Sequence, residues 1–279
     1  MRKVSDDYDD FLSLGKHLPA LSGDGWRGSL RRNLEAAMGL PRTRRLLAEM
    51  EDRIRAGDPV FEALLGVSGI AIDAPGVVEA IPASGAVVVV SNHPFGGADA
   101  AVMAALATRA RPDTRILANA ELLGMPGLGD WLFPLRILGE AGAARANIAM
   151  LRRAVEHLRD GGLLVIFPAG AVAHWQWHSA RVEDPPWPPH AARLVRTSGA
   201  PVLPVRFFGA NPPWFELLGA LHPLVRSAMI PRAFLSMSGR TVQCRAGDLL
   251  TGKALRHDPE TLTGTLRAAV RGVCDAPGN

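Results

Sequence analysis

The sequence predicts an α/β fold in which a mixed, largely parallel central sheet is flanked by helices. Residues 86–90 and 163–167 are uninterrupted apolar runs, as expected for strands that are buried on both faces. Helical apolar patterns occur between and beside such runs, at residues 99–110 and 147–159. Strands that alternate with helices are typical of an α/β layer architecture.

The remaining elements are predicted from the same kinds of pattern. Residues 26–56 have helical periodicity, and Pro41 is expected to divide them into two helices. Residues 69–72 and 77–81 look like the two strands of a hairpin with a turn at 73–76. Further strands are expected at 115–118, 201–207 and 240–245, with a short helix at 189–197 and an apolar face on helix 147–159 made by Ile148, Leu151, Val155 and Leu158. We expect residues 1–60 to be a helical extension packed on a main domain of residues 61–279.

The composition favours an ordered protein with a sizeable core and a modestly basic surface. Of the 279 residues, 48% are hydrophobic, which argues against wholesale disorder. The net charge of +4 suits anionic lipid, a phosphorylated substrate or nucleic acid without choosing between them. There is no signal peptide and no apolar run of roughly 18 residues, so we expect a cytoplasmic protein that is soluble or peripheral to a membrane. The two cysteines, Cys244 and Cys274, have no metal-ligand spacing and are expected to be packing residues.

One histidine and one aspartate stand where an α/β sheet usually places its chemistry. His93 follows the predicted strand 86–90 by three residues, and ligands of α/β sheets bind just beyond the carboxyl ends of strands. Asp99 lies at the start of the next helix. A neutral imidazole can accept a proton from a hydroxyl, and a carboxylate on its other nitrogen fixes the tautomer. By spacing alone, Asp99 as a helix cap and His93 as a turn residue is the favoured interpretation, because a lone pair of histidine and aspartate is weak evidence of catalysis.

The segment Asn92-His93-Pro94-x-Gly96-Gly97-x-Asp99 resembles the first motif of the lysophospholipid (glycerolipid) acyltransferase superfamily. The usual spacing is His-x4-Asp. The His-x5-Asp spacing found here resembles the bacterial hemolysin-like or ornithine-lipid-type branch. Three further resemblances follow in the family's order: Arg145-x-Asn147 to the second motif, Phe167-Pro168-Ala169-Gly170 to the third, and residues 200–205 to the fourth. One departure is Ala171, at a position where this branch usually has glutamate.

The resemblance implies a glycerolipid acyltransferase-like layered fold and an O-acyltransferase activity. The acyl group would pass from acyl-CoA or acyl-carrier protein to the hydroxyl of a lysolipid, such as lysophosphatidic acid or a lyso-ornithine lipid. His93 would be the general base, Asp99 would orient it, and backbone N–H groups near Gly96-Gly97 or Gly170 would stabilise the oxyanion. The implied catalytic residues are His93 and Asp99, and the implied substrate-binding residues are Asn92, Gly96, Gly97, Arg145, Phe167, Pro168 and Gly170.

This interpretation names the expected partners and leaves two alternatives open. The partners are the lysolipid acceptor, the thioester donor and the cytoplasmic face of a membrane; we expect no metal, no cofactor other than the co-substrate and no nucleic acid. Ala171 keeps open a catalytically weakened member that binds lipid or acyl carrier. A hydrolase that releases the acyl group to water would use the same dyad. The spacing of His174 and His178 could suit a metal on a helix, but no third ligand is evident.

Overall fold

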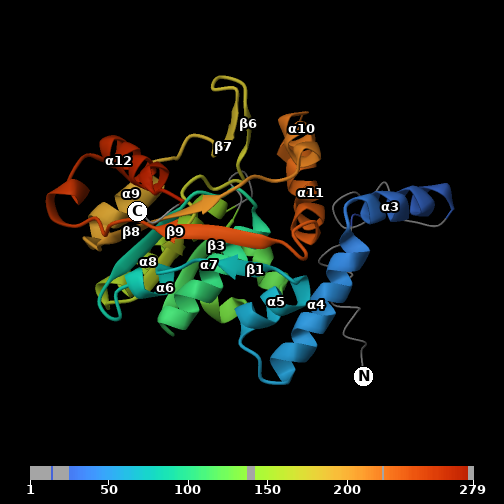
Figure 1. The fold of residues 1–279 in the computed structure, drawn as a ribbon, viewed down its shortest axis with the longest axis horizontal. Coiled ribbons are helices and arrows are strands. Elements are labelled where there is room, and N and C mark those ends of the chain that lie inside the picture. The colour runs from blue at the N-terminus through green and yellow to red at the C-terminus, as the bar shows by residue number, and fades with distance from the viewer. Residues whose placement is uncertain (1–13, 15–24, 137–141, 222, 276–279) are drawn as a thin grey trace.

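The computed structural model describes residue 14 and residues 25–136, 142–221 and 223–275. Its centre is a seven-stranded sheet, shown in Figure 1. Every neighbouring pair is parallel except β8 and β9, so the prediction of a mixed, largely parallel sheet is confirmed. The strand order is β1 (Ala71–Asp73), β9 (Thr241–Ala246), β8 (Val202–Phe208), β2 (Val87–Ser91), β5 (Leu163–Ile166), β3 (Thr114–Asn119) and β4 (Leu132–Leu135).

Strand β2 is the middle strand, and its side chains alternate between two hydrophobic cores. All five of its residues are buried. Val87 and Val89 join one core, whereas Val88 and Val90 join the other, because successive side chains of a strand point to opposite faces. A strand covered on both faces and paired on both edges is held firmly. The residues that follow Ser91 therefore leave the sheet from a rigid base.

Helices cover both faces of the sheet. The first core contains α5 (Val60–Ser68), α6 (Val77–Ala80) and α7 (Gly97–Ala110). The second contains α8 (Ala143–Arg159), α9 (His190–Ser198) and α12 (Pro259–Gly272). Figure 1 shows α9 and α12 on one side of the sheet and α5, α6 and α7 on the other.

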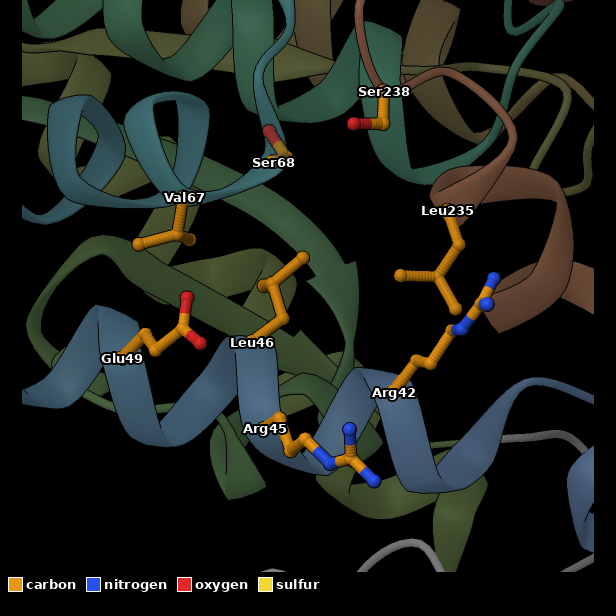
Figure 2. A pocket seen from close by; sticks show the side chains of 8 residues that line it. All are labelled: Arg42, Arg45, Leu46, Glu49, Val67, Ser68, Leu235 and Ser238. Atoms are coloured by element: carbon orange, nitrogen blue, oxygen red, sulfur yellow. The ribbon is translucent and has the colours of Figure 1, made fainter.

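The predicted break of the N-terminal helix is confirmed. Helix α3 (Trp26–Ala37) is followed by α4 (Leu40–Arg55), in which Pro41 occupies the first turn, where its missing N–H costs no hydrogen bond. Helix α4 packs on α5 and on α11 (Pro223–Leu235). The seam between them leaves a hollow of about 220 Å³, and Figure 2 shows Arg42 and Arg45 of α4 at its edge. The division into an extension of residues 1–60 and a main domain stays a prediction.

Two local predictions were wrong. Residues 77–81 do not form the second strand of a hairpin. Gly76 adopts a left-handed conformation, and Val77 begins the short helix α6 with its side chain fully buried. Strand β1 instead pairs in parallel with β9, a partner about 170 residues away that local sequence cannot reveal. On α8, Leu158 is buried as predicted but Ile148 is 52% exposed.

Several elements lie outside the sequence predictions. They include the small antiparallel pair β6 (His174–Gln176) and β7 (Arg181–Glu183), and the helix α10 (Pro213–Leu221). In Figure 1 the β6–β7 hairpin projects from the body beside α10, and the two elements are in contact. The hairpin belongs to the chain segment between β5 and α9. Residues of this segment contact the turn that follows β2.

Candidate active site

His93 and Asp99 meet at the junction between β2 and α7. His93 is the second residue after the strand, and Asp99 is in the first turn of the helix. Between them, Gly96 has a φ of +76°, which favours glycine because a side chain is strained there. A Cβ on Gly96 would lie 2.9 Å from a methyl group of Val172, and a Cβ on Gly97 would lie 2.8 Å from the ring of Phe234. The two glycines thus permit both the turn and the close packing around it.

The histidine and aspartate side chains are in contact. His93 Nδ1 lies 3.1 Å from Asp99 Oδ1. The two atoms are close enough for an ion pair, but the ring N–H is not aligned closely enough for a good hydrogen bond. Such contacts in catalytic pairs often tighten when substrate binds. Asp99 is fully buried and is held by the N–H groups of Phe95 and Ala100, each donating over 2.8 Å.

The environment of His93 stabilises its protonated form. Burial is the largest single influence on the ring and lowers its pKa. The charge of Asp99, its contact with Nδ1 and the charge of Asp184 together outweigh burial, so the pKa of His93 lies above its ordinary value of 6.5. Because Nδ1 faces Asp99, Nε2 is the nitrogen left to exchange a proton with another molecule.

The third predicted motif lies directly against the dyad. The ring of Phe167 packs on the ring of His93 with 4.4 Å between centroids and a tilt of 35°. Pro168 is buried. The N–H of Gly170 donates to the carbonyl oxygen of Phe167 (3.1 Å), so this N–H is committed to a turn. This favours Gly96 and Gly97 over Gly170 as the source of oxyanion donors. The position of the missing glutamate, Ala171, is half-buried and directly precedes Val172, which packs on Gly96.

Asn92 connects the site to β8. Its side-chain amide donates to the carbonyl oxygen of Phe207 (2.9 Å), and its Oδ1 accepts the N–H of the same residue (2.8 Å). Both polar ends of the amide are therefore used by one residue of the neighbouring strand. This geometry gives Asn92 a structural role, and its contact with substrate stays a prediction. It also explains the fourth motif, since β8 supplies the backbone that anchors the turn.

Sequence reasoning missed Asp184. This buried carboxylate accepts the backbone N–H of His93 at Oδ1 (3.0 Å) and the indole N–H of Trp187 at Oδ2 (2.9 Å). The carbonyl oxygen of His93 in turn accepts the N–H of Ala173 (2.8 Å). The signal for Asp184 in the sequence is weak: an aspartate before two prolines and a tryptophan, 91 residues from His93.

Arg145 is further from the dyad than the other predicted residues. It lies exposed in the first turn of α8. Helix α8 contacts β4, which is three strand spacings, about 14 Å, from β2. Its neighbour Asn147 links α8 to the end of β4, accepting the N–H of Arg136 (2.8 Å) and donating to its carbonyl oxygen (2.9 Å). The structure therefore brings the first, third and fourth motifs together and leaves the second at the edge of the sheet.

Two other features of the described residues bear on function. His174 and His178 do not share a helix, because residues 174–176 form β6 and the chain then turns. Within the residues that the structure describes, no group of three or more side chains is arranged to hold a metal ion. None of the described helices combines the length and the apolar character needed to cross a membrane.

The hollow of Figure 2 is not part of this site. None of the predicted site residues lines it, and its rim combines Arg42 and Arg45 with Glu49. A second hollow, of about 190 Å³, lies next to the dyad and is bounded by Asn92 and Asp184. Neither His93 nor Asp99 lines the second hollow, which lies beside them at the carboxyl ends of β2 and β8.

Comparisons with known proteins found a family model and a solved structure that resemble this chain. Residues 77–207 match the family model described as Acyltransferase, a segment that includes His93, Asp99 and the third motif. A search of curated proteins finds no match. Among solved structures, the 1-acyl-sn-glycerophosphate (LPA) acyltransferase PlsC from Thermotoga maritima is similar in fold, with 17% identity, a TM-score of 0.50, and coverage of 96% of this chain and 92% of that one. The matched segment supports an acyltransferase activity, and the solved structure shows that the chain shares the fold of a known acyltransferase.

Proposed function

We propose that this acyltransferase moves a fatty acyl group from an acyl thioester, acyl-CoA or acyl-carrier protein, to the hydroxyl of a lysolipid. The observation that carries the proposal is the pair His93 and Asp99, 3.1 Å apart at the carboxyl end of the central strand. Lysophosphatidic acid and a lyso-ornithine lipid are the acceptors we propose to test first. The His-x5-Asp spacing supports the hemolysin-like or ornithine-lipid-type branch.

The proposed reaction is a direct attack without a covalent enzyme intermediate. Nε2 of His93 takes the proton of the acceptor hydroxyl while the oxygen attacks the thioester carbonyl carbon. The negative charge that develops on the carbonyl oxygen is stabilised by the N–H groups of Gly96 and Gly97, which the first turn of α7 leaves without helical partners. The C–S bond then breaks, and the leaving thiolate recovers the proton from the imidazolium. Asp99 orients the ring and stabilises its positive charge.

The acceptor's acidic group is proposed to bind Arg145. A guanidinium binds phosphate or carboxylate through paired N–H donors. With α8 beginning beside β4, an acceptor that reaches both Arg145 and His93 lies along the carboxyl edge of the sheet across β5 and β3. Ala171 adds no carboxylate to this edge, which favours an acceptor that makes fewer hydrogen bonds to the enzyme there.

We propose that α3 is one surface by which the protein rests on a membrane. Trp26, Leu30 and Leu34 are 72%, 40% and 40% exposed, and their spacing of four residues puts them on one face of the helix. Arg27 and Arg32 flank this stripe and are exposed as well. Tryptophan favours the water–lipid boundary, and arginine favours anionic headgroups.

A second apolar surface supports the same proposal. Trp177, in the β6–β7 hairpin, is 78% exposed, and Leu217 of α10 is 69% exposed. The two elements are in contact. Since the hairpin belongs to the chain segment that carries Asp184, a membrane on this surface would lie close to the acyl-transfer site.

The test of the enzymatic proposal compares His93→Gln with His178→Gln. His178 is an exposed histidine and serves as the matched control. Each purified protein is incubated with radiolabelled acyl-CoA or acyl-carrier protein and a panel of lysolipids that includes the two proposed acceptors. We expect product lipid from the wild type and the control, and a loss of about 10²–10⁴-fold in His93→Gln. Turnover within threefold of wild type in a folded His93→Gln protein would refute the mechanism.

The same assay separates the two alternative functions. Release of thiol without an acceptor points to a hydrolase that uses the same dyad. Saturable binding of lysolipid or acyl carrier, with no product from any donor, points to the weakened, binding-only protein that Ala171 suggests.

The membrane proposal is tested by sedimentation with vesicles that contain anionic phospholipid. We expect the double variant Leu30→Ser/Leu34→Ser to lose most of its vesicle binding, because it removes two of the three exposed apolar side chains of α3. Ile148→Ser is the control, since Ile148 is a similarly exposed apolar residue on a different helix. Equal binding by the double variant and the control would contradict a role for α3.

A further inference from the structure

We propose that Asp184 is a positioning residue for His93: it holds the backbone of the histidine in place and supplies a second negative charge beside the imidazolium that forms during proton transfer. The proposal rests on the function proposed for His93. Asp184 touches neither substrate nor the reacting atoms in this role, and it acts through the histidine.

The contacts around Asp184 form a rigid chain that ends at His93. Oδ1 accepts the N–H of His93 (3.0 Å), and Oδ2 accepts the indole N–H of Trp187 (2.9 Å). Trp187 is buried in the core formed with α9 and α12. On the same residue, the backbone carbonyl of Asp184 accepts a guanidinium N–H of Arg267 on α12 (2.9 Å). Asp184 is thus fixed through both its side chain and its backbone.

A second contact from the same chain segment completes the support of His93. The N–H of Ala173 donates to the carbonyl oxygen of His93 (2.8 Å), so residues 173 and 184 engage the two polar groups of one peptide backbone. With Phe167 stacked on the ring, the segment from β5 to α9 determines where His93 points. These three contacts all come from residues outside the motif that contains the dyad.

A neutral acceptor would satisfy the N–H of His93 equally well. A buried carboxylate is costly to remove from water, so its use in place of an amide needs a reason. The reason we infer is electrostatic. A fixed negative charge in a site of low polarity stabilises a positive charge that appears nearby, and the imidazolium of His93 is that charge. The charge of Asp184 already acts on His93, since it is among the influences that raise the pKa of the ring.

The charged groups around Asp184 leave the effect of its negative charge on His93 largely intact. Burial holds the pKa of Asp184 above its ordinary value, while the two N–H donors, from His93 and Trp187, and the charge of His93 pull it down. Asp99 faces the ring from α7, and His174 of β6 also feels the charge of Asp184. The positive charge of Arg267 on α12 is shared with Glu183, 3.7 Å away. Asp99 and Asp184 are therefore the two carboxylates that act on His93.

The experiment compares Asp184→Asn with Glu183→Gln. Both replace a carboxylate by its amide in adjacent residues, but Glu183 pairs with Arg271 on α12 and has no contact with His93. The amide of Asp184→Asn can accept from only one of the two donors, so either the N–H of His93 or the indole N–H of Trp187 loses its acceptor, and the negative charge beside His93 is gone. We expect kcat to fall about 10–100-fold in Asp184→Asn, as for a misplaced catalytic group. We expect the rising limb of kcat/KM against pH to move to lower pH, because a charge that raises the pKa of His93 is gone. Glu183→Gln should keep both the rate and the profile.

Two further measurements keep the test decisive. Trp187→Phe removes only the donor to Oδ2 and is expected to lower kcat by a smaller factor, without a shift of the pH limb, because the charge remains. NMR titration of the His93 ring, identified by the resonance that is missing in His93→Gln, reports the shift independently of catalysis. A folded Asp184→Asn protein with the rate, the pH limb and the His93 titration of Glu183→Gln would overturn the proposal.

The readouts also separate this inference from the proposed function. If His93→Gln keeps its activity but Asp184→Asn still lowers the titration midpoint of His93, the function fails while the electrostatic link stands. If His93→Gln is inactive and Asp184→Asn leaves both kcat and the titration unchanged, the positioning role fails while the function stands.

Discussion

The substitution Asp99→Asn isolates what the buried carboxylate of the dyad contributes. Three N–H groups surround Asp99 in a fully buried position: those of Phe95 and Ala100 donate to it over 2.8 Å, and Nδ1 of His93 lies 3.1 Å away at an ion-pair distance. An asparagine has the same shape but only one accepting oxygen, and its NH2 group must face at least one of these donors. The variant therefore loses both the charge and part of the hydrogen bonding.

The expected magnitudes follow from those contacts. Losing a hydrogen bond to a buried charged acceptor costs about 1.5–3 kcal/mol of stability. The loss of orientation and charge at the general base should lower kcat about 10²–10⁴-fold. Asp99 raises the pKa of His93, so its removal lowers that pKa, and the rising limb of the pH–rate profile should move toward lower pH. The variant is thus slower at its plateau but reaches that plateau at lower pH.

The assay is kcat as a function of pH at saturating acceptor and donor, with urea unfolding of the same preparations. Asp130→Asn, at an exposed aspartate in the short 3-10 helix Gly129–Trp131, is the control. The combination of a lower plateau and an acid shift distinguishes lost electrostatics from simple misfolding, which lowers the plateau alone. A folded Asp99→Asn enzyme with kcat within threefold of wild type and an unmoved limb would refute the role assigned to Asp99.

Three other predictions concern the turn and the acceptor. Gly96→Ala should destabilise the protein by about 1–3 kcal/mol more than Gly142→Ala in urea unfolding, since both have φ near +77° but only Gly96 has a methyl group 2.9 Å from the new Cβ; equal losses would contradict the packing argument. Arg145→Ala should raise KM for acidic lysolipids about tenfold or more with kcat little changed, while the exposed Arg152→Ala on the same helix should not; a kcat effect alone would be the wrong outcome. Ala171→Glu should fold normally, because residue 171 is half-buried at the site's edge, and should change the ranking of acceptors in the lysolipid panel; an identical ranking would remove Ala171 from acceptor selection.

Much of the fold could be predicted from local sequence patterns. The valine run of β2 predicted a buried strand, and the helical pattern after it predicted the helix that the structure has at α7. The break at Pro41 was predictable from the chemistry of proline alone. The hairpin at residues 69–81 was not, because the partner of β1 is decided by a strand from the far end of the chain.

The candidate site also has one part that the sequence predicts and another part that depends on the tertiary structure. The sequence by itself determined the pair His93 and Asp99, since six residues of strand–turn–helix bring them within contact of each other, and it determined that Gly96 and Gly97 form the turn. Only the tertiary structure decided that Asn92 holds β8, that Phe167 stacks on His93, and that Asp184 supports the histidine from 91 residues away. The physical reason is range: a local motif sets its own backbone, whereas hydrogen bonds and charges act between whatever side chains the packing of the sheet brings together.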